Sequence, residues 1–76
     1  MLRKRSFTLS GHATSVALEP EFWAVLEQEA ASRGQALAAL VGGLDLERGA
    51  APLASACRVA ALGYARSHGV EELTRR

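Results

Sequence analysis

The start of the chain alternates between apolar and polar or small side chains, which is the pattern of β-strands. Residues 6–9 alternate, with Phe7 and Leu9 on one side, and residues 13–18 alternate in the same way. In the second segment one face carries Thr14, Val16 and Leu18, and the other carries Ala13, Ser15 and Ala17. Residues 10–12 between them are typical of a tight turn, where Gly11 can adopt a positive φ. Either the two segments form a hairpin, or only residues 13–18 form a strand and the first segment is an arm that lies on its neighbour.

After Leu18 the apolar spacing changes to that of helices. Pro20 suits the first turn of a helix and Glu21 suits its positive end, so a helix is predicted over residues 22–33, with Gly34 as its stop. Its core stripe is Phe22, Val25, Leu26 and Ala30, with Trp23 beside it. A second helix is predicted over residues 35–44, with an apolar stripe at Leu37, Leu40, Val41 and Leu44.

A third helix is predicted from Leu53 to about Ser67, after a loop over residues 45–52, and Gly69 is expected to end it. This helix is apolar on more than one side. One stripe is Leu53, Ala56, Cys57, Ala60 and Tyr64, and Val59 and Leu62 lie on another. A helix of this kind is buried between neighbours, and in so short a chain the neighbours are expected to include another subunit.

The length of 76 residues allows one small domain, which usually needs a further source of stability. The single cysteine, Cys57, excludes an internal disulfide, and His12 and His68 stand apart, so no cluster indicates a structural metal. A lone strand also leaves backbone groups unpaired along both of its edges. A second copy of the chain, paired strand against strand, would give the domain further stability and would also pair the free backbone groups of the strand. The predicted result is a two-stranded ribbon on a four-helix base, and such a ribbon fits the major groove of DNA.

Composition and charge refine this picture. Apolar residues make up 49% of the chain but aromatic residues only 5%, and the alanine and leucine that supply the difference favour helices. The net charge is only +1, yet Arg3, Lys4 and Arg5 cluster at the amino end, where residues 1–5 are expected to form a disordered basic arm. That arm either grips phosphates or only keeps the domain in solution. No apolar run is long enough for a signal peptide or a membrane span, so a cytoplasmic protein is expected.

Several motifs resemble the ribbon-helix-helix proteins, in particular a bacterial subgroup with a Gly-His-x-Thr-Ser-x-x-Leu-Glu-x-x-Phe-Trp signature. The matching residues are Gly11-His12-Ala13-Thr14-Ser15-Val16-Ala17-Leu18-Glu19-Pro20 and Phe22-Trp23. The later Leu53-Ala54-Ser55-Ala56-Cys57-Arg58 is similar to the Leu-Ser-Ser-Ala-x-Arg helix of the same subgroup. The resemblance extends from residue 4 to about residue 67.

The resemblance implies a mainly α fold with a short β ribbon, namely a ribbon-helix-helix intertwined homodimer with an additional C-terminal helix. The domain is expected over residues 6–68, and residues 69–76 are expected to form a frayed tail. The resemblance also implies that outward ribbon side chains face DNA bases and that the start of the second helix holds a phosphate. The residues expected to contact DNA are Arg3, Lys4, Arg5, His12, Ala13, Ser15, Ala17, Gln35 and Ala36. Those expected in the dimer core are Val16, Leu18, Phe22, Trp23, Leu26, Leu37, Leu40 and Val41.

The chain departs from the subgroup at three of these positions. Ala13 and Ala17 stand on the outward ribbon face where longer polar residues are commoner, and Ala36 stands at the N-cap of the second helix where serine is usual. Alanine can touch a thymine methyl, but it makes none of the bidentate base contacts that distinguish bases. Ser15 is the best single candidate for a base contact.

Other residues have competing interpretations. His12 either contacts DNA or senses pH, or it caps the turn with a hydrogen bond, which is favoured. Trp23 is expected to pack in the core or the dimer interface, with stacking on a base as the alternative. Cys57 is expected to be an inert small hydrophobe. Arg58 is expected to pair with an acid such as Glu27, the alternative being that it lines a functional surface.

The sequence therefore predicts a homodimeric DNA-binding protein, a transcriptional repressor or an autoregulator, with residues 53–67 as the route to any higher oligomer. The alternative is a protein-interaction module of the same fold that has lost sequence-specific reading of DNA. An enzyme is not expected, because the chain has no Ser/His/Asp set, no acid pair and no glycine-rich phosphate loop. No cofactor, metal or membrane partner is expected, whereas a protein partner remains open.

Overall fold

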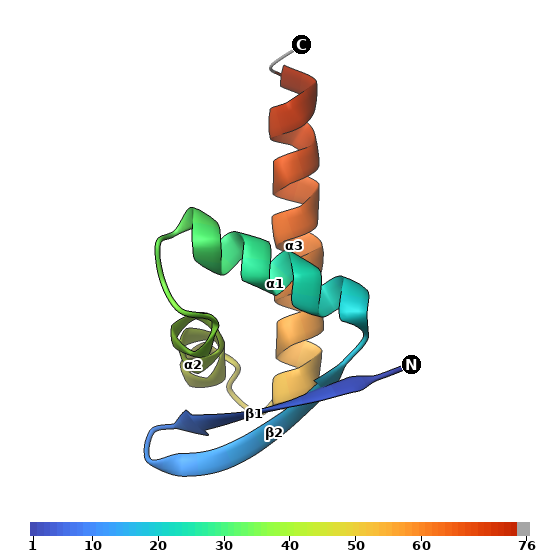
Figure 1. Cartoon of the computed structure of the whole chain (residues 1–76). Coiled ribbons are helices and arrows are strands. Elements are labelled where there is room, and N and C mark those ends of the chain that lie inside the picture. Colours follow the sequence, from blue (N-terminus) through green and yellow to red (C-terminus); the bar gives the residue numbers. More distant parts are fainter. Residues whose placement is uncertain (75–76) are drawn as a thin grey trace.

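A β-hairpin lies along one side of three helices (Figure 1). The computed structural model describes the backbone of residues 1–74 and the side chains of residues 1–67. The strands are β1 (Arg3–Leu9) and β2 (His12–Leu18), and the helices are α1 (Pro20–Ser32), α2 (Leu37–Glu47) and α3 (Leu53–Thr74). Helix α1 packs across α3, and α2 packs against both, while α2 supports β1 and α3 supports β2.

The hairpin is closed by a two-residue turn. Ser10 has φ +51° and Gly11 has φ +80°, which are the two positive values that a type I′ turn requires. Such a turn fixes the register, so that Leu9 lies opposite His12, Phe7 opposite Thr14 and Arg5 opposite Val16. Of the two arrangements that the sequence allowed for residues 6–9, the hairpin is the one observed.

Helix α1 ends in a Schellman motif at Gly34. The backbone N–H of Gly34 donates to the carbonyl of Ala31 over 3.0 Å, and that of Gln35 donates to the carbonyl of Ala30 over 3.0 Å. The φ of Gly34 is +66°, a left-handed conformation that a side chain disfavours, so the predicted role of this glycine as a stop is confirmed.

The core lies between the hairpin and the helices and draws on all five elements. Its buried members are Leu9, Val16, Leu18, Trp23, Leu26, Ala30, Leu40, Val41, Cys57 and Ala61. Six of the eight residues predicted for the dimer core are among them, and the other two, Phe22 and Leu37, are partly buried against them. They build the core of the single chain, so a role in a dimer interface stays a prediction. Ala30 and Cys57 lie on apolar stripes that the sequence predicts, whereas Leu9 and Ala61 were not singled out as core residues.

The disordered arm predicted over residues 1–5 is wrong for residues 3–5. Arg3, Lys4 and Arg5 belong to β1, because the backbone of β2 extends far enough to pair with them, Arg3 lying opposite Leu18. The indole Nε1 of Trp23 also donates to the carbonyl of Arg3 over 2.8 Å and fixes the start of the strand. Pairing with β2 therefore orders residues 3–5, although their composition alone indicates a solvated arm.

Helix α3 is longer than predicted. It continues through Gly69 to Thr74, so the expected helix end at Gly69 and the frayed tail from residue 69 are wrong as far as residue 74. A glycine inside a helix costs only about 1 kcal/mol relative to alanine, and no proline follows Gly69 to stop the helix. Residues 75–76, the end of the predicted tail, lie outside the described residues.

Candidate nucleic-acid interface

The face of the hairpin that points away from the helices is built by alternating residues of both strands. Val16 and Leu18 are buried on the inner face, so Ala13, Ser15 and Ala17 lie on the outer one. In the observed register each has a β1 residue of the same face directly opposite. The outer-face pairs are Lys4 with Ala17, Ser6 with Ser15, and Thr8 with Ala13.

A direct contact supports this assignment of faces. The hydroxyl oxygens of Ser6 and Ser15 lie 3.1 Å apart across the two strands, within hydrogen-bond distance. Ala17 is half-buried and the other five residues of the outer face are exposed. We call these six residues, Lys4, Ser6, Thr8, Ala13, Ser15 and Ala17, the outer face of the hairpin. The outer face is small and polar, with Lys4 as its one charged residue.

Strand alternation divides the basic cluster of the amino end. Arg3 and Arg5 share the inner face with Phe7 and Leu9, whereas Lys4 lies on the outer face. The Arg5 guanidinium forms an ion pair with Glu27 and lies 5.3 Å from the centre of the Trp23 ring. Arg5 is therefore neutralised within the fold, which disfavours a direct contact between this residue and DNA.

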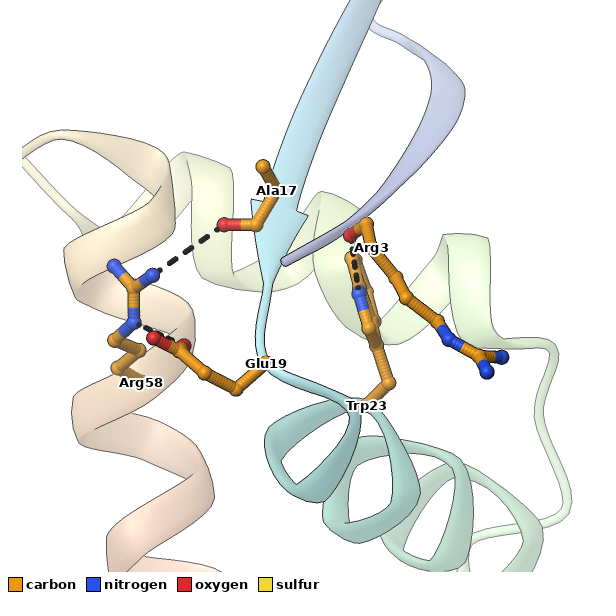
Figure 2. A network of polar contacts seen from close by, with 5 residues as sticks. All are labelled: Arg3, Ala17, Glu19, Trp23 and Arg58. Carbon is orange, nitrogen blue, oxygen red and sulfur yellow. Dashed lines mark hydrogen bonds and ion pairs between the residues drawn. The ribbon is translucent and has the colours of Figure 1, made fainter. Parts of the chain in front are cut away.

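Arg58 of α3 ties the end of β2 to the start of α1 (Figure 2). Its Nε donates to Oε1 of Glu19 over 3.0 Å, and its Nη2 donates to the carbonyl of Ala17 over 3.5 Å. The guanidinium also lies 5.9 Å from the centre of the Phe22 ring. The expected ion pair of Arg58 with an acid is confirmed, but the acid is Glu19 and not Glu27, because the crossing of α1 and α3 places Glu19 beside Arg58, and Glu27 pairs with Arg5.

The contacts of Glu19 change its titration. A hydrogen bond with its own backbone, followed by the hydrogen bond from Arg58, lowers the pKa of the Glu19 carboxyl below its ordinary value. The charged form of Glu19 is therefore favoured in the folded protein.

The free edge of β2 can be assigned from the same contacts. Successive peptide groups of a strand point to opposite edges, and the pair that flanks a two-residue turn is a hydrogen-bonded pair. The carbonyl of Ala17 points to Arg58, away from β1. The peptide groups of Ala13, Ser15 and Ala17 thus lie along the edge of β2 that β1 leaves unpaired.

Helix α2 is Leu37–Glu47, so the predicted bounds of 35–44 are wrong at both ends, and the helix continues through Gly42 and Gly43 into the predicted loop. Its N-cap is the one that the resemblance implies. Ala36 is the N-cap residue, is exposed, and makes no side-chain capping hydrogen bond. Its carbonyl accepts from the N–H groups of Ala39 and Leu40. The N–H groups of Leu37 and Ala38 are first-turn donors, which an α-helix leaves without an acceptor inside the helix. Gln35 is half-buried beside this turn.

Three further residues have defined surroundings. His12 is exposed at the start of β2, and among the described residues no partner is found for the predicted turn-capping hydrogen bond of its side chain. Trp23 is only 4% exposed and makes a tilted ring contact with Phe7, so its predicted core position is confirmed. Cys57 is buried, and burial raises the pKa of its thiol, which disfavours the reactive thiolate.

The sequence prediction did not include Ser6 and Thr8 among the candidate site residues. Their alternation with Phe7 and Leu9 was the available signal, but it places them on the outer face only once β1 is known to pair with β2. No helix in the described part of the chain is both long and apolar enough to cross a membrane. Over the same residues no group of three or more metal-ligating side chains occurs.

The comparison with protein families identifies the chain. The model of the ribbon-helix-helix domain family matches residues 2–65, so the chain belongs to the ribbon-helix-helix domain family. Domains of this family are typically DNA-binding transcriptional regulators that dimerise, and they are generally not enzymes. No curated protein and no solved structure matches the chain.

Proposed function

We propose that this protein is a homodimeric transcriptional repressor or autoregulator that inserts an antiparallel β ribbon into the major groove of DNA. The observation that supports this function best is the outer face of the hairpin, which is small and polar, is exposed at five of its six residues, and is backed by a packed core. A β ribbon fits the major groove, where base edges can be distinguished. A repressor of this kind acts in the cytoplasm.

The free edge of β2 supports the dimer. The peptide groups of Ala13, Ser15 and Ala17 lie along that edge, where the Ala17 carbonyl already accepts from Arg58, and pairing with β2 of a second chain satisfies the other groups. In this arrangement the two strands at the centre of the sheet are the two copies of β2, and their outward side chains come from both subunits. A two-fold symmetric protein then favours a pseudo-palindromic DNA site.

Phosphate contacts supply most of the affinity in this proposal. The unpaired N–H groups at the start of α2, with exposed Ala36 and neighbouring Gln35, suit a phosphate of the DNA backbone. Such contacts position the protein but carry no sequence information. Sequence preference comes from the outer face, where Ser15 contacts a base edge and Ala13 and Ala17 approach thymine methyl groups.

The decisive experiment is a salt series of binding to duplexes of mixed sequence. Affinity should fall steeply as salt rises. The logarithm of the binding constant should fall by about 0.9 per tenfold rise in salt for each phosphate contact, and the affinity should differ between duplexes. Binding that is absent even at low salt would contradict the proposal and favour a protein-interaction module. The exposed side chains of Leu46, Val59 and Leu62 on α2 and α3, which are 79%, 71% and 56% accessible, support that alternative.

A further inference from the structure

The two strands of the hairpin contribute different chemistry to the outer face. On β2 two of the three outward residues are alanines, and only Ser15 can donate or accept a hydrogen bond. On β1 all three outward residues, Lys4, Ser6 and Thr8, have polar groups. The register sets each alanine against one of the longer β1 residues, Ala17 against Lys4 and Ala13 against Thr8.

This pairing makes the β1 side chains accessible from outside. Directly opposite residues of an antiparallel pair have Cβ atoms about 5 Å apart, so each short alanine leaves space beside its longer neighbour. Lys4, Ser6 and Thr8 are all exposed, and among the described residues only Ser6 has a side-chain hydrogen-bond partner, Ser15. The Lys4 ammonium and the Thr8 hydroxyl therefore have polar groups free for a ligand.

We propose that the outward row of β1, formed by Lys4, Ser6 and Thr8, is a second DNA-reading strand that supplies the base contacts missing at Ala13 and Ala17. The inference rests on the proposed function and names residues of the same site. β1 lies about 4.8 Å from β2, so the four strands of the dimer span about 14 Å, and each β1 lies at the rim of the major groove, which is about 12 Å wide, with its outward side chains directed at that rim. Lys4 donates to the O6 and N7 acceptors of guanine. Thr8 bonds a base edge through its hydroxyl and contacts a thymine through its methyl group.

The test selects binding sites from a pool of duplexes whose randomised core is about two helical turns long. The native protein should enrich a defined sequence. Thr8→Val removes the hydroxyl but retains the shape and the strand preference of the side chain. It should change the selected bases at one position of each half-site and weaken binding to the native consensus by about fivefold or more.

The hairpin offers a matched control for this variant on its opposite face. Thr14 is half-buried on the inner face of β2 and lies opposite Phe7, so Thr14→Val makes the same chemical change away from DNA. The Thr14→Val protein should select the native sequence with native affinity.

Lys4 has an equally close control in Arg5. Lys4→Met and Arg5→Met each remove one positive charge from β1, but Lys4 lies on the outer face and Arg5 pairs with Glu27 on the inner one. Both variants lower the net charge by one unit, so each should lose a small, sequence-independent part of the affinity, and Arg5→Met should lose no more of it than Lys4→Met, because Arg5 is paired with Glu27. Only Lys4→Met should also lose a guanine preference, with a further loss of about fivefold or more on the native consensus.

The outcomes separate the inference from the function on which it rests. If the native protein enriches no sequence, the proposed function fails and the inference fails with it. The native protein could instead enrich a sequence, and Thr8→Val and Lys4→Met could select that same sequence. In that case β1 does not read bases, although the proposed function stands. A uniform loss of affinity in these variants, with unaltered base preference, would likewise overturn the inference, because it would assign β1 to phosphates.

Discussion

Nε of Arg58 lies 3.0 Å from Oε1 of Glu19, and this ion pair joins α3 to the corner between the ribbon strand β2 and α1. Both side chains are partly accessible, at 33% and 41%, so the charge pair alone contributes little stability. Its importance is geometric. The same guanidinium reaches the carbonyl of Ala17 on the free edge of β2, where the partner strand is proposed to pair.

The first prediction concerns the pH dependence of this corner. The folded-state pKa of Glu19 is lowered from its ordinary value of 4.5, so its contribution to stability is fully present above that pH. The contribution is lost as the pH falls through the lower, folded-state pKa. The native protein should therefore be more stable than Glu19→Gln at neutral pH, and the difference should shrink below pH 4.5. Denaturant unfolding at several pH values measures this, and a constant difference would contradict it.

The second prediction uses two glycines that differ in backbone conformation. Gly34 has φ +66° and open space where a Cβ atom would stand, so Gly34→Ala should destabilise by about 1–2 kcal/mol through backbone strain alone. Gly43 lies inside α2, also with open space, and Gly43→Ala should stabilise by up to about 1 kcal/mol. Thermal or denaturant unfolding compares the two. Equal effects of the same sign would show that the α1 C-cap is misassigned.

The third prediction concerns the N-cap of α2. Ala36→Ser should stabilise the protein by about 1 kcal/mol, because the hydroxyl can accept from a first-turn N–H group. Ala39→Ser, in the exposed part of the same first turn, is the control and should be neutral or slightly destabilising. If DNA phosphate binds here, Ala36→Ser should also strengthen binding to all duplexes about equally. Greater stability with unchanged DNA affinity would place the phosphate elsewhere.

Much of this fold was predictable from the sequence, because its signals are local. The alternation of residues 13–18, Pro20 at the start of α1 and Gly34 at its end each indicate their own element. The N-cap at Ala36 was instead implied by the family resemblance, since alanine itself caps helices poorly. The strand structure of Arg3–Arg5 was not predictable. Polar residues on both faces of a segment indicate a solvated, disordered segment unless the strand with which it pairs is known. The partner of Arg58 depended on how α1 and α3 cross. The outer-face role of Ser6 and Thr8 depended on the register of the hairpin.

The fourth prediction tests the free edge of β2. The N–H of Ser15 points to this edge, so Ser15→Pro removes a donor that the single chain does not use but that a pairing β2 strand requires. Ser15→Pro should shift the protein from dimer to monomer, or prevent folding if the monomer is unstable. Ser15→Ala retains the N–H and should remain dimeric. Light scattering measures the mass, and a Ser15→Pro protein that stays dimeric would show that subunits meet through another surface.

The mass of the protein–DNA complex tests the central claim most directly. Sedimentation of the native protein with a duplex selected from the randomised pool should give one duplex with two chains of 8.0 kDa each, or a multiple of two where dimers bind side by side. The complex should dissociate as salt rises. A complex of one duplex with a single chain, or no complex at low salt, would contradict a dimeric protein that reads DNA through its ribbon.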